Sequence, residues 1–262
     1  MRIRVLGCGH SGGTPMLGGP SGSDWGACDP KNPRNRRLRP SILIEDGATA
    51  LLVDTSPDLR QQLLQAGVSR LDAVLFTHAH ADHLHGIDDL RAINRAMGED
   101  LPGFANAATW QAIEQRFGYT LTPLPEDTDF YFKPCIEANA LEHGQTIKLG
   151  GMEVTAFRQD HGFSESLGLR IGRFAYSTDL VRLPDESIPF VQDLDVWIVD
   201  ALRERPNPVH FSVEEAVALI ERIGPGRAYL THLSHGLDYA TLSARLPGGI
   251  EPAHDGLVIE LD

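Results

Sequence analysis

The chain has 262 residues, of which 42% are hydrophobic and 23% charged; these values are typical of a folded globular protein and exclude a disordered or fibrous chain. Its 36 acidic and 23 basic residues give a formal net charge of −13, and because an acidic surface repels polyphosphate chains, a general nucleic-acid binder is disfavoured. No run approaches the roughly 18 to 20 apolar residues that span a bilayer, and three scattered cysteines are too few for a disulfide framework, so we expect a cytoplasmic protein that does not cross a membrane.

In chain order, short β-rich runs alternate with stretches of helical periodicity. The predicted strands are residues 3–6, 41–45, 50–53, 73–76, 152–157, 167–171, 174–177, 196–199, 228–231 and 257–261. The predicted helices are residues 57–66, 109–117, 212–223 and 239–246, and Ser212 with Glu215 forms a capping box at the start of the third. Consecutive strands with helices between them at intervals predict an α/β fold of mixed sheets covered by helices.

Two stretches rich in turn-forming residues, 9–40 and 97–103, are predicted to be loops. A loop of about 30 residues is uncommon in a compact domain unless it borders a functional site. The sequence has no repeat of fixed period, no low-complexity tract and no long Pro/Ser-rich linker that would divide it.

The most informative segment follows the apolar strand at 73–76 and reads Thr-His-Ala-His-Ala-Asp-His. It places three imidazoles and one carboxylate within six residues, a set that is costly to pack without a cation. Because alternate residues of an extended chain point the same way, we expect His78 and His80 to face one side and Asp82 and His83, after a tight turn, the other. The spacing therefore predicts two adjacent metal sites, each of which needs further ligands.

Three later residues stand where predicted strands end: His161, Asp179 in Ser-Thr-Asp, and His232 in Leu-Thr-His. Asp179 is equally consistent with a turn residue, whereas the Thr-His pair at 231–232 repeats the pair at 77–78. The complete set of five histidines and two aspartates predicts a dinuclear site. Because its members, from residue 78 to residue 232, must meet in one place, we expect a single domain over residues 1–262.

The HAHADH segment at 78–83, with these downstream residues, resembles the metallo-β-lactamase superfamily over essentially the whole chain. Four further segments are similar to the PhnP-like branch, which contains the phosphodiesterase of the carbon-phosphorus lyase pathway: LGCGHSGGTP at 6–15, RRLRPS at 36–41, HGIDDLR at 85–91 and YLTHLSH at 229–235. The resemblance implies a four-layer αβ/βα sandwich, two mixed sheets flanked by helices, with the metals at one edge between the sheets.

The resemblance also implies which residues hold two divalent ions per chain. Zn or Mn is the expected metal, and Fe or Ni is the alternative. The first metal would take His78, His80 and His161, and the second Asp82, His83 and His232, with Asp179 bridging both. Asp54 matches an aspartate that orients a ligand in the family; alternatively it caps the helix predicted at 57–66, and the two roles can coexist.

A dinuclear site of this kind generates its own nucleophile, because two divalent ions about 3.5 to 4 Å apart lower the pKa of a shared water toward about 7 and clamp phosphate oxygens. The departing oxygen still needs a proton, for which His210 and His235 are the imidazole candidates. The resemblance favours His210, and Asp82 is counted with them as a catalytic candidate.

The arginines at 34, 36, 37 and 39 are a local exception in an acidic chain. Arg36, Arg37 and Arg39 are candidates for binding substrate phosphate in a bidentate manner, although such a run is more often a solvated surface. Relatives of the carbon-phosphorus lyase enzyme often carry a cysteine cluster in the N-terminal loop that holds a structural zinc. Here residues 18–30 offer Cys28 alone, so we expect no such zinc.

We therefore expect a phosphodiesterase that cleaves a small cyclic or diester phosphate with a metal-bridging hydroxide. The main alternative is a tRNA 3′-processing endoribonuclease, which the net charge disfavours but does not eliminate, and a third is a member like the B protein of pyrroloquinoline quinone biosynthesis. A zinc β-lactamase, a thioesterase of the glyoxalase II kind and a non-catalytic metal-binding module fit less well. The expected partner is a small phosphodiester; the oligomeric state stays open, with a homodimer as one option.

Overall fold

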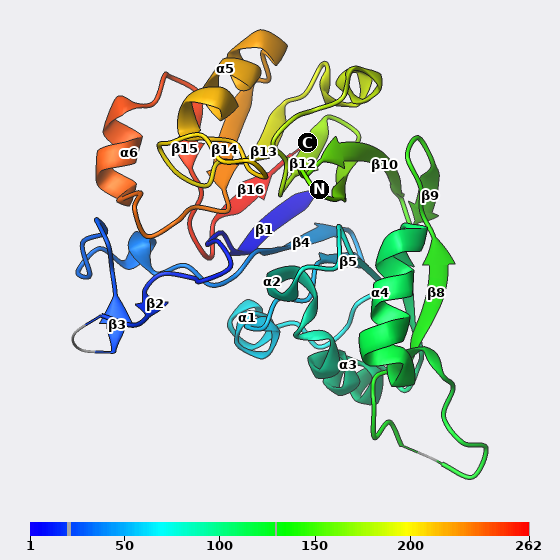
Figure 1. The fold of residues 1–262 in the computed structure, drawn as a ribbon. Coiled ribbons are helices and arrows are strands. Elements are labelled where there is room, and N and C mark those ends of the chain that lie inside the picture. The colour runs from blue at the N-terminus through cyan, green and yellow to red at the C-terminus, as the bar shows by residue number, and fades with distance from the viewer. Residues whose placement is uncertain (20–21, 129, 262) are drawn as a thin grey trace.

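The buried strands form two seven-stranded sheets that pack face to face (Figure 1). The structure is a computed structural model and describes residues 1–19, 22–128 and 130–261. The first sheet has the order β16-β1-β4-β5-β6-β7-β8, with β1 at Arg2–Gly7, β4 at Ser41–Asp46, β5 at Thr49–Val53, β6 at Ala73–Leu75, β7 at Leu101–Ala105, β8 at Ile136–Ala140 and β16 at Val258–Glu260. The second has the order β15-β14-β13-β12-β11-β10-β9, with β9 at Thr146–Leu149, β10 at Met152–Asp160, β11 at Glu165–Ile171, β12 at Phe174–Ser177, β13 at Val196–Asp200, β14 at Arg227–Thr231 and β15 at Ile250–Pro252. A small hairpin of β2 (Met16–Leu17) and β3 (Ser23–Asp24) lies outside both sheets.

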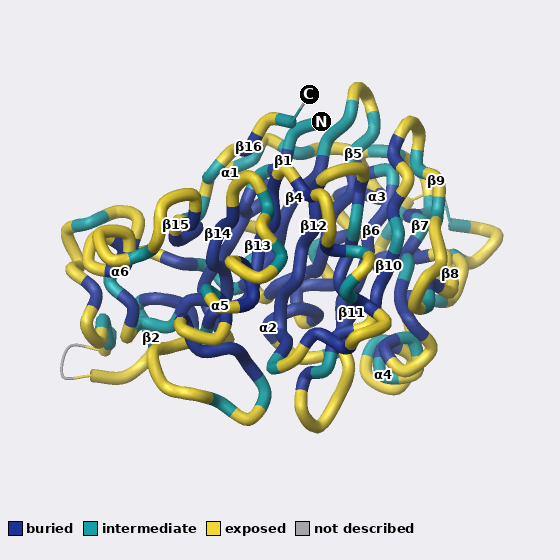
Figure 2. Tube along the Cα trace, turned by 90° about the horizontal axis from the view of Figure 1, so that it is seen from above, coloured by how far each residue is buried: buried dark blue, intermediate teal, exposed yellow. Residues whose placement is uncertain are grey.

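Both faces of both sheets are buried, which requires four layers. Successive side chains of a strand point to opposite faces. In β4, Ile42 and Ile44 belong to the core between the sheets, whereas Leu43 belongs to the core under the helices of the first sheet. In β13, Ile198 faces the other sheet and Trp197 faces the helices of the second. Figure 2 shows this buried interior of strands with exposed loops around it.

Helices cover the outer face of each sheet and supply the outer layers. The first sheet is covered by α1 (Leu59–Ala66), α2 (Ala81–Leu84), α3 (Leu90–Met97) and α4 (Ala107–Phe117), and the second by α5 (Val213–Ile223) and α6 (Tyr239–Arg245). Short 3-10 helices lie at η1 (Pro33–Asn35), η2 (Ile87–Asp89), η3 (Gly118–Leu121) and η4 (Asp185–Val191). The predicted sandwich of two mixed sheets flanked by helices is confirmed.

The strand directions bring the ends of several strands to one edge of the sandwich. In the first sheet β5, β6, β7 and β8 are parallel. In the second sheet β12, β13 and β14 are parallel, and β10 runs in the same direction because two antiparallel pairings separate it from β12. Side chains that follow the carboxyl ends of these strands can therefore meet.

The prediction of a loop at residues 97–103 is wrong. Met97 ends α3, and β7 begins at Leu101. The sequence hid this strand because Pro102 and Gly103, which are rare in strands, occupy its middle. Gly103 is required there by close packing, since a Cβ atom would lie 2.5 Å from Ile136 and 2.9 Å from Trp110.

Other elements agree with or extend the predictions. The capping box of Ser212 and Glu215 is confirmed at the start of α5. The segment 9–40 contains β2, β3 and η1 rather than only loop, and Gly9 pairs with Leu233, next to His232. The segment also includes residues 20–21, which lie outside the described residues. None of the helices in the described part of the chain is both long and apolar enough to cross a membrane.

Candidate metal centre

The candidate ligands converge at the shared edge because each follows a strand. His78 and His80 lie in the loop after β6, and Asp82 and His83 lie in the single turn of α2 that this loop enters. His161, Asp179 and His232 follow β10, β12 and β14. All seven are buried except His80, and the structure brings together the whole set expected from the sequence.

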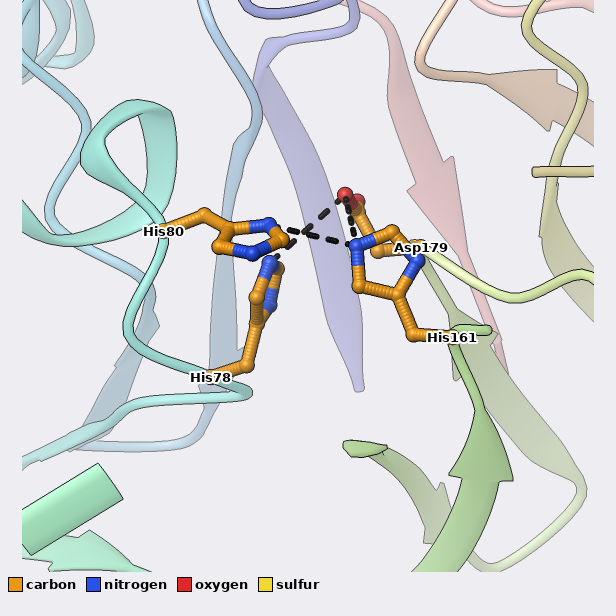
Figure 3. A group of neighbouring side chains, drawn as sticks. All are labelled: His78, His80, His161 and Asp179. Atoms are coloured by element: carbon orange, nitrogen blue, oxygen red, sulfur yellow. Dashed lines mark hydrogen bonds and ion pairs between the residues drawn. The ribbon is translucent and has the colours of Figure 1, made fainter. Parts of the chain in front are cut away.

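The first group consists of His78, His80, His161 and Asp179, whose potential ligand atoms all lie within 4.8 Å of one another (Figure 3). The Nε2 atoms of His78 and His161 each lie 3.6 Å from Oδ2 of Asp179. His80 Nδ1 lies 3.2 Å from His161 Nε2. Three imidazole nitrogens and one carboxylate oxygen thus point at a common centre.

The second group consists of Asp82, His83 and His232, and it reaches the first through the other oxygen of Asp179. Oδ2 of Asp82 lies 3.3 Å from His232 Nε2 and 3.6 Å from His83 Nε2. Oδ1 of Asp179 lies 3.0 Å from His83 Nε2 and 3.5 Å from His232 Nε2. Each oxygen of the Asp179 carboxylate therefore faces a different group.

The electrostatics of the cluster are those of carboxylates among imidazoles. Burial raises the pKa of Asp179, but the neighbouring imidazoles of His232 and His83 outweigh it and hold that pKa well below its usual range. Burial lowers the pKa of His78, and the adjacent His83 lowers it further. The cluster thus favours ionised aspartate together with a neutral His78, which are the forms that bind a metal.

The residues present fit divalent metal ions. His78 Nε2 and His83 Nε2 are buried and make no well-aligned hydrogen bond among the described residues, although Asp179 Oδ1 lies 3.0 Å from His83 Nε2. Their Nδ1 atoms, by contrast, are occupied by Thr77 Oγ1 at 3.1 Å and Asp54 Oδ2 at 2.7 Å. A buried polar atom without a partner is costly, and a metal at each Nε2 would satisfy it.

Asp54 orients this part of the cluster. Its carboxylate contacts His83 Nδ1 and accepts hydrogen bonds from the backbone N–H of Thr77 at 2.7 Å and from the Thr77 hydroxyl at 2.8 Å. It does not cap a helix, because the N-cap of α1 is Asp58; that alternative is wrong. Partners of this kind fix the tautomer and direction of a ligating histidine.

Asp200, the last residue of β13, is a functional candidate that the sequence reasoning missed. Its Oδ2 lies 2.9 Å from His210 Nδ1, and its Oδ1 lies 3.7 Å from His232 Nδ1. Burial lowers the pKa of His210, but the Asp200 carboxylate outweighs it and raises that pKa to about 9. The only signal in the sequence was an aspartate at the end of an apolar strand.

His210 lies against the cluster, whereas His235 does not. His210 Nε2 is 3.9 Å from Asp179 Oδ2, its ring stacks on that of His232 at 4.6 Å between centroids, and together these three residues form a further potential ligand group. His235 instead pairs with Asp24 at 3.6 Å and stacks on His10 at 5.9 Å.

The structure does not bring the arginine segment into the cluster. The guanidinium of Arg37 is buried and donates to the carbonyls of Ser234 and Leu237, at 2.9 Å and 2.6 Å, so it supports the chain after His232. Arg39 pairs with Asp58 at 2.9 Å, and Arg36 lies over the ring of Trp25 at 5.0 Å.

The backbone at the cluster is left-handed at three residues. Asp54, Asp179 and His232 have φ angles of 64°, 55° and 59°, and among the described non-glycine residues only Asp193 also has a positive φ. Such conformations cost of order 1–3 kcal/mol each and persist where the surrounding structure imposes them. They turn the chain sharply at strand ends, which aims the side chains at the cluster.

Comparisons with known proteins agree with this geometry. A family model described as a beta-lactamase superfamily domain matches residues 49–233. A crystal structure of a diphosphatase from the PhnP family has a TM-score of 0.87 and 33% sequence identity, covering 100% of this chain and 98% of that one.

Two curated relatives are longer than this chain. An octanoyltransferase of Porphyromonas gingivalis is 32% identical over 268 residues, and the match covers 100% of this chain but 52% of that protein. A ribonuclease Z of Bradyrhizobium diazoefficiens is 30% identical over 145 residues, which cover 52% of this chain and 44% of the nuclease. The chain thus spans about half the length of these two relatives.

Proposed function

Because the chain belongs to the metallo-β-lactamase superfamily and is a hydrolase similar to the PhnP family, we propose that it is a dinuclear-metal phosphodiesterase that cleaves a small cyclic or diester phosphate. The observation that carries the proposal is the Asp179 carboxylate, whose two oxygens face two different ligand groups. A carboxylate placed in this way could bridge two adjacent metal ions.

Seven residues would hold the two ions. His78, His80 and His161 would hold the first, Asp82, His83 and His232 the second, and Asp179 both. When bound, two divalent ions would lower the pKa of a water molecule and would hold the oxygens of a reacting phosphate in place. The native metal belongs to the Zn, Mn, Fe or Ni set that imidazole and carboxylate ligands accept.

His210 would supply the proton that the leaving oxygen needs. In hydrolysis, the oxygen of water bonds to phosphorus, the bond to the leaving oxygen breaks, and that oxygen takes up one proton while the water gives up another. Asp200 holds Nδ1 of His210, which leaves Nε2 directed at the cluster, 3.9 Å from Asp179. His210 is therefore placed to act as the general acid, and Asp200 to keep it oriented and protonated.

A small substrate suits the charge of the chain. The net charge of −13 opposes binding of a polyanionic RNA, and the diphosphatase of the PhnP family is similar over almost its full length. A tRNA-processing nuclease is the second candidate, since a ribonuclease Z is among the relatives. We do not carry over octanoyl transfer, because about half of that relative lies outside the match. We place the activity in the cytoplasm, on the basis of the three scattered cysteines.

An activity panel tests the proposal. Protein loaded separately with Mn and Zn would be assayed on bis(p-nitrophenyl) phosphate, cyclic nucleotides, a ribosyl cyclic phosphate, a diphosphate diester, precursor tRNA and a lactone. We expect turnover of a small phosphate ester and about two metal ions per chain by elemental analysis. Exclusive cleavage of precursor tRNA would establish the nuclease instead, and fewer than about 1.5 equivalents of metal would contradict the dinuclear site.

A further inference from the structure

A cavity of about 410 Å³ lies between the arginine segment and α1, apart from the candidate metal centre. None of the seven candidate ligands lines it, and neither does His210. This volume lies within the range of small-molecule sites. The proposed function leaves the arginines of this segment without a role, and the cavity gathers three of them around one space. Its walls include Thr14, Arg36, Arg37, Arg39, Gln61 and Asp255.

The two acidic side chains on the cavity wall are already engaged. Asp58 pairs with Arg39 at 2.9 Å. The carboxylate of Asp255 accepts hydrogen bonds from the backbone N–H groups of Cys8 and Leu38, at 3.1 Å and 2.7 Å. Burial also raises the pKa of Asp255 to about 7, which reduces its negative charge near neutral pH. These acids therefore do not cancel the charge of the remaining arginines.

Two arginines of the cavity have no carboxylate partner. Among the described residues, no carboxylate lies within ion-pair distance of Arg36 or Arg37, although the chain has a net charge of −13. Arg37 is only 2% exposed, and its Nη1 and Nη2 atoms donate to the carbonyls of Ser234 and Leu237. A buried charge without an opposite charge beside it is costly, and an anion in the cavity would offset that cost.

Two polar atoms of the cavity residues also lack hydrogen bonds. Nε of Arg37 and Oγ1 of Thr14, a residue that is 4% exposed, are buried and have no hydrogen-bond partner among the described residues. The backbones of Thr14 and Arg37 exchange two hydrogen bonds, both of 2.9 Å, so these two walls are held together. Both atoms are donors, and buried donors without an acceptor are costly. The oxygens of a bound anion would accept from both.

We propose that this cavity binds a small phosphate-type oxyanion, with Arg36 and Arg37 as its charged donors and Thr14 as its hydroxyl donor. A tetrahedral phosphate offers several oxygens, which suits two guanidinium forks and a hydroxyl better than a single planar carboxylate does. Free inorganic phosphate and the phosphate group of a phosphorylated metabolite share this chemistry. The inference does not rest on the proposed function, because none of these residues belongs to the metal centre.

Calorimetric titration of inorganic phosphate into the metal-loaded protein tests the site. The variants are Arg36→Gln and Thr14→Val, and Arg60→Gln is the matched control, since Arg60 is an exposed arginine of α1 that does not line the cavity. Arg37 is left intact, because its replacement would also remove its hydrogen bonds to two backbone carbonyls. We expect binding to be about tenfold weaker in Arg36→Gln, about threefold weaker in Thr14→Val and unchanged in Arg60→Gln.

Phosphate could also bind to the metal ions, so the titration would be repeated with Asp179→Ala that a chelator has freed of metal. Phosphate binding that persists there, and that adding Arg36→Gln weakens about tenfold, supports the cavity site. Loss of all phosphate binding in metal-free Asp179→Ala would assign the phosphate to the metals and overturn the inference, as would equal affinities of wild type and Arg36→Gln.

Two further titrants identify the chemistry of the ligand. A sugar phosphate that binds more tightly than inorganic phosphate, and that Arg36→Gln weakens in the same way, supports the site with a phosphorylated metabolite as its ligand. Equal or weaker binding of the sugar phosphate supports the site with free phosphate as its ligand. Acetate that binds as tightly as phosphate would overturn the assignment of a phosphate-type oxyanion.

Discussion

Replacing Asp200 by asparagine should reduce turnover more than it reduces metal binding. The substitution keeps the shape of the side chain but removes the charge that lies 2.9 Å from His210 Nδ1 and 3.7 Å from His232 Nδ1. A hydrogen bond to a charged partner contributes about 1.5–3 kcal/mol, which corresponds to roughly a tenfold to hundredfold loss in kcat through His210. Because 3.7 Å is longer than a hydrogen bond, the effect through His232 on metal affinity should be only a few-fold.

Turnover of bis(p-nitrophenyl) phosphate and competition with a chromogenic chelator measure the two effects separately. Asp195→Asn is a suitable control, since Asp195 immediately precedes β13 at its opposite end and, among the described residues, its side chain pairs only with the exposed Arg173. Asp200→Asn with wild-type kcat, full metal content and an unchanged unfolding midpoint would refute the assignment of Asp200 as the residue that positions His210.

Three further perturbations test the site and the fold. Asp179→Ala should lose metal and activity together, as elemental analysis and turnover would show, and a fully metallated, active variant would rule out the bridge. His210→Ala should keep both metals and lose about 10² to 10⁴ in rate, whereas His235→Ala should retain activity; the reverse pattern would move the proton donor to His235. Burial raises the pKa of Asp255 to about 7, so the folded state holds this proton more tightly than the unfolded chain. The stability that the proton contributes is full below about pH 4 and is lost as pH rises to about 7, by up to about 4 kcal/mol. In urea unfolding of metal-free protein, the free energy of unfolding of Asp255→Asn should therefore rise relative to that of wild type as the pH increases across this range. A difference between the two proteins that does not change with pH would contradict the shifted pKa.

The candidate ligands could be predicted because they form a dense local pattern. Three histidines and an aspartate between residues 78 and 83 have few structural explanations, and the end of a strand is a position that can be read from the sequence. Asp200 could not be predicted in this way, because it is defined by a contact with His210, ten residues on.

The sheets could be predicted where their strands are apolar and not where they are polar or irregular. Strand β8 has one buried residue, Ile136, followed by four exposed ones, so it lacks the hydrophobic pattern of a strand and was missed. Strand β7 was hidden by its proline and glycine. The assignment of residues 1–262 to a single domain stays a prediction.

The left-handed backbone at Asp54, Asp179 and His232 also limits how this site can evolve. Outside glycine, aspartate, asparagine and histidine are the residue types enriched at positive φ. Glutamate carries the same carboxylate as aspartate but lacks this tolerance. At these three positions, selection for backbone shape and selection for chemistry retain the same few residue types, so drift there is restricted even toward chemically equivalent substitutions.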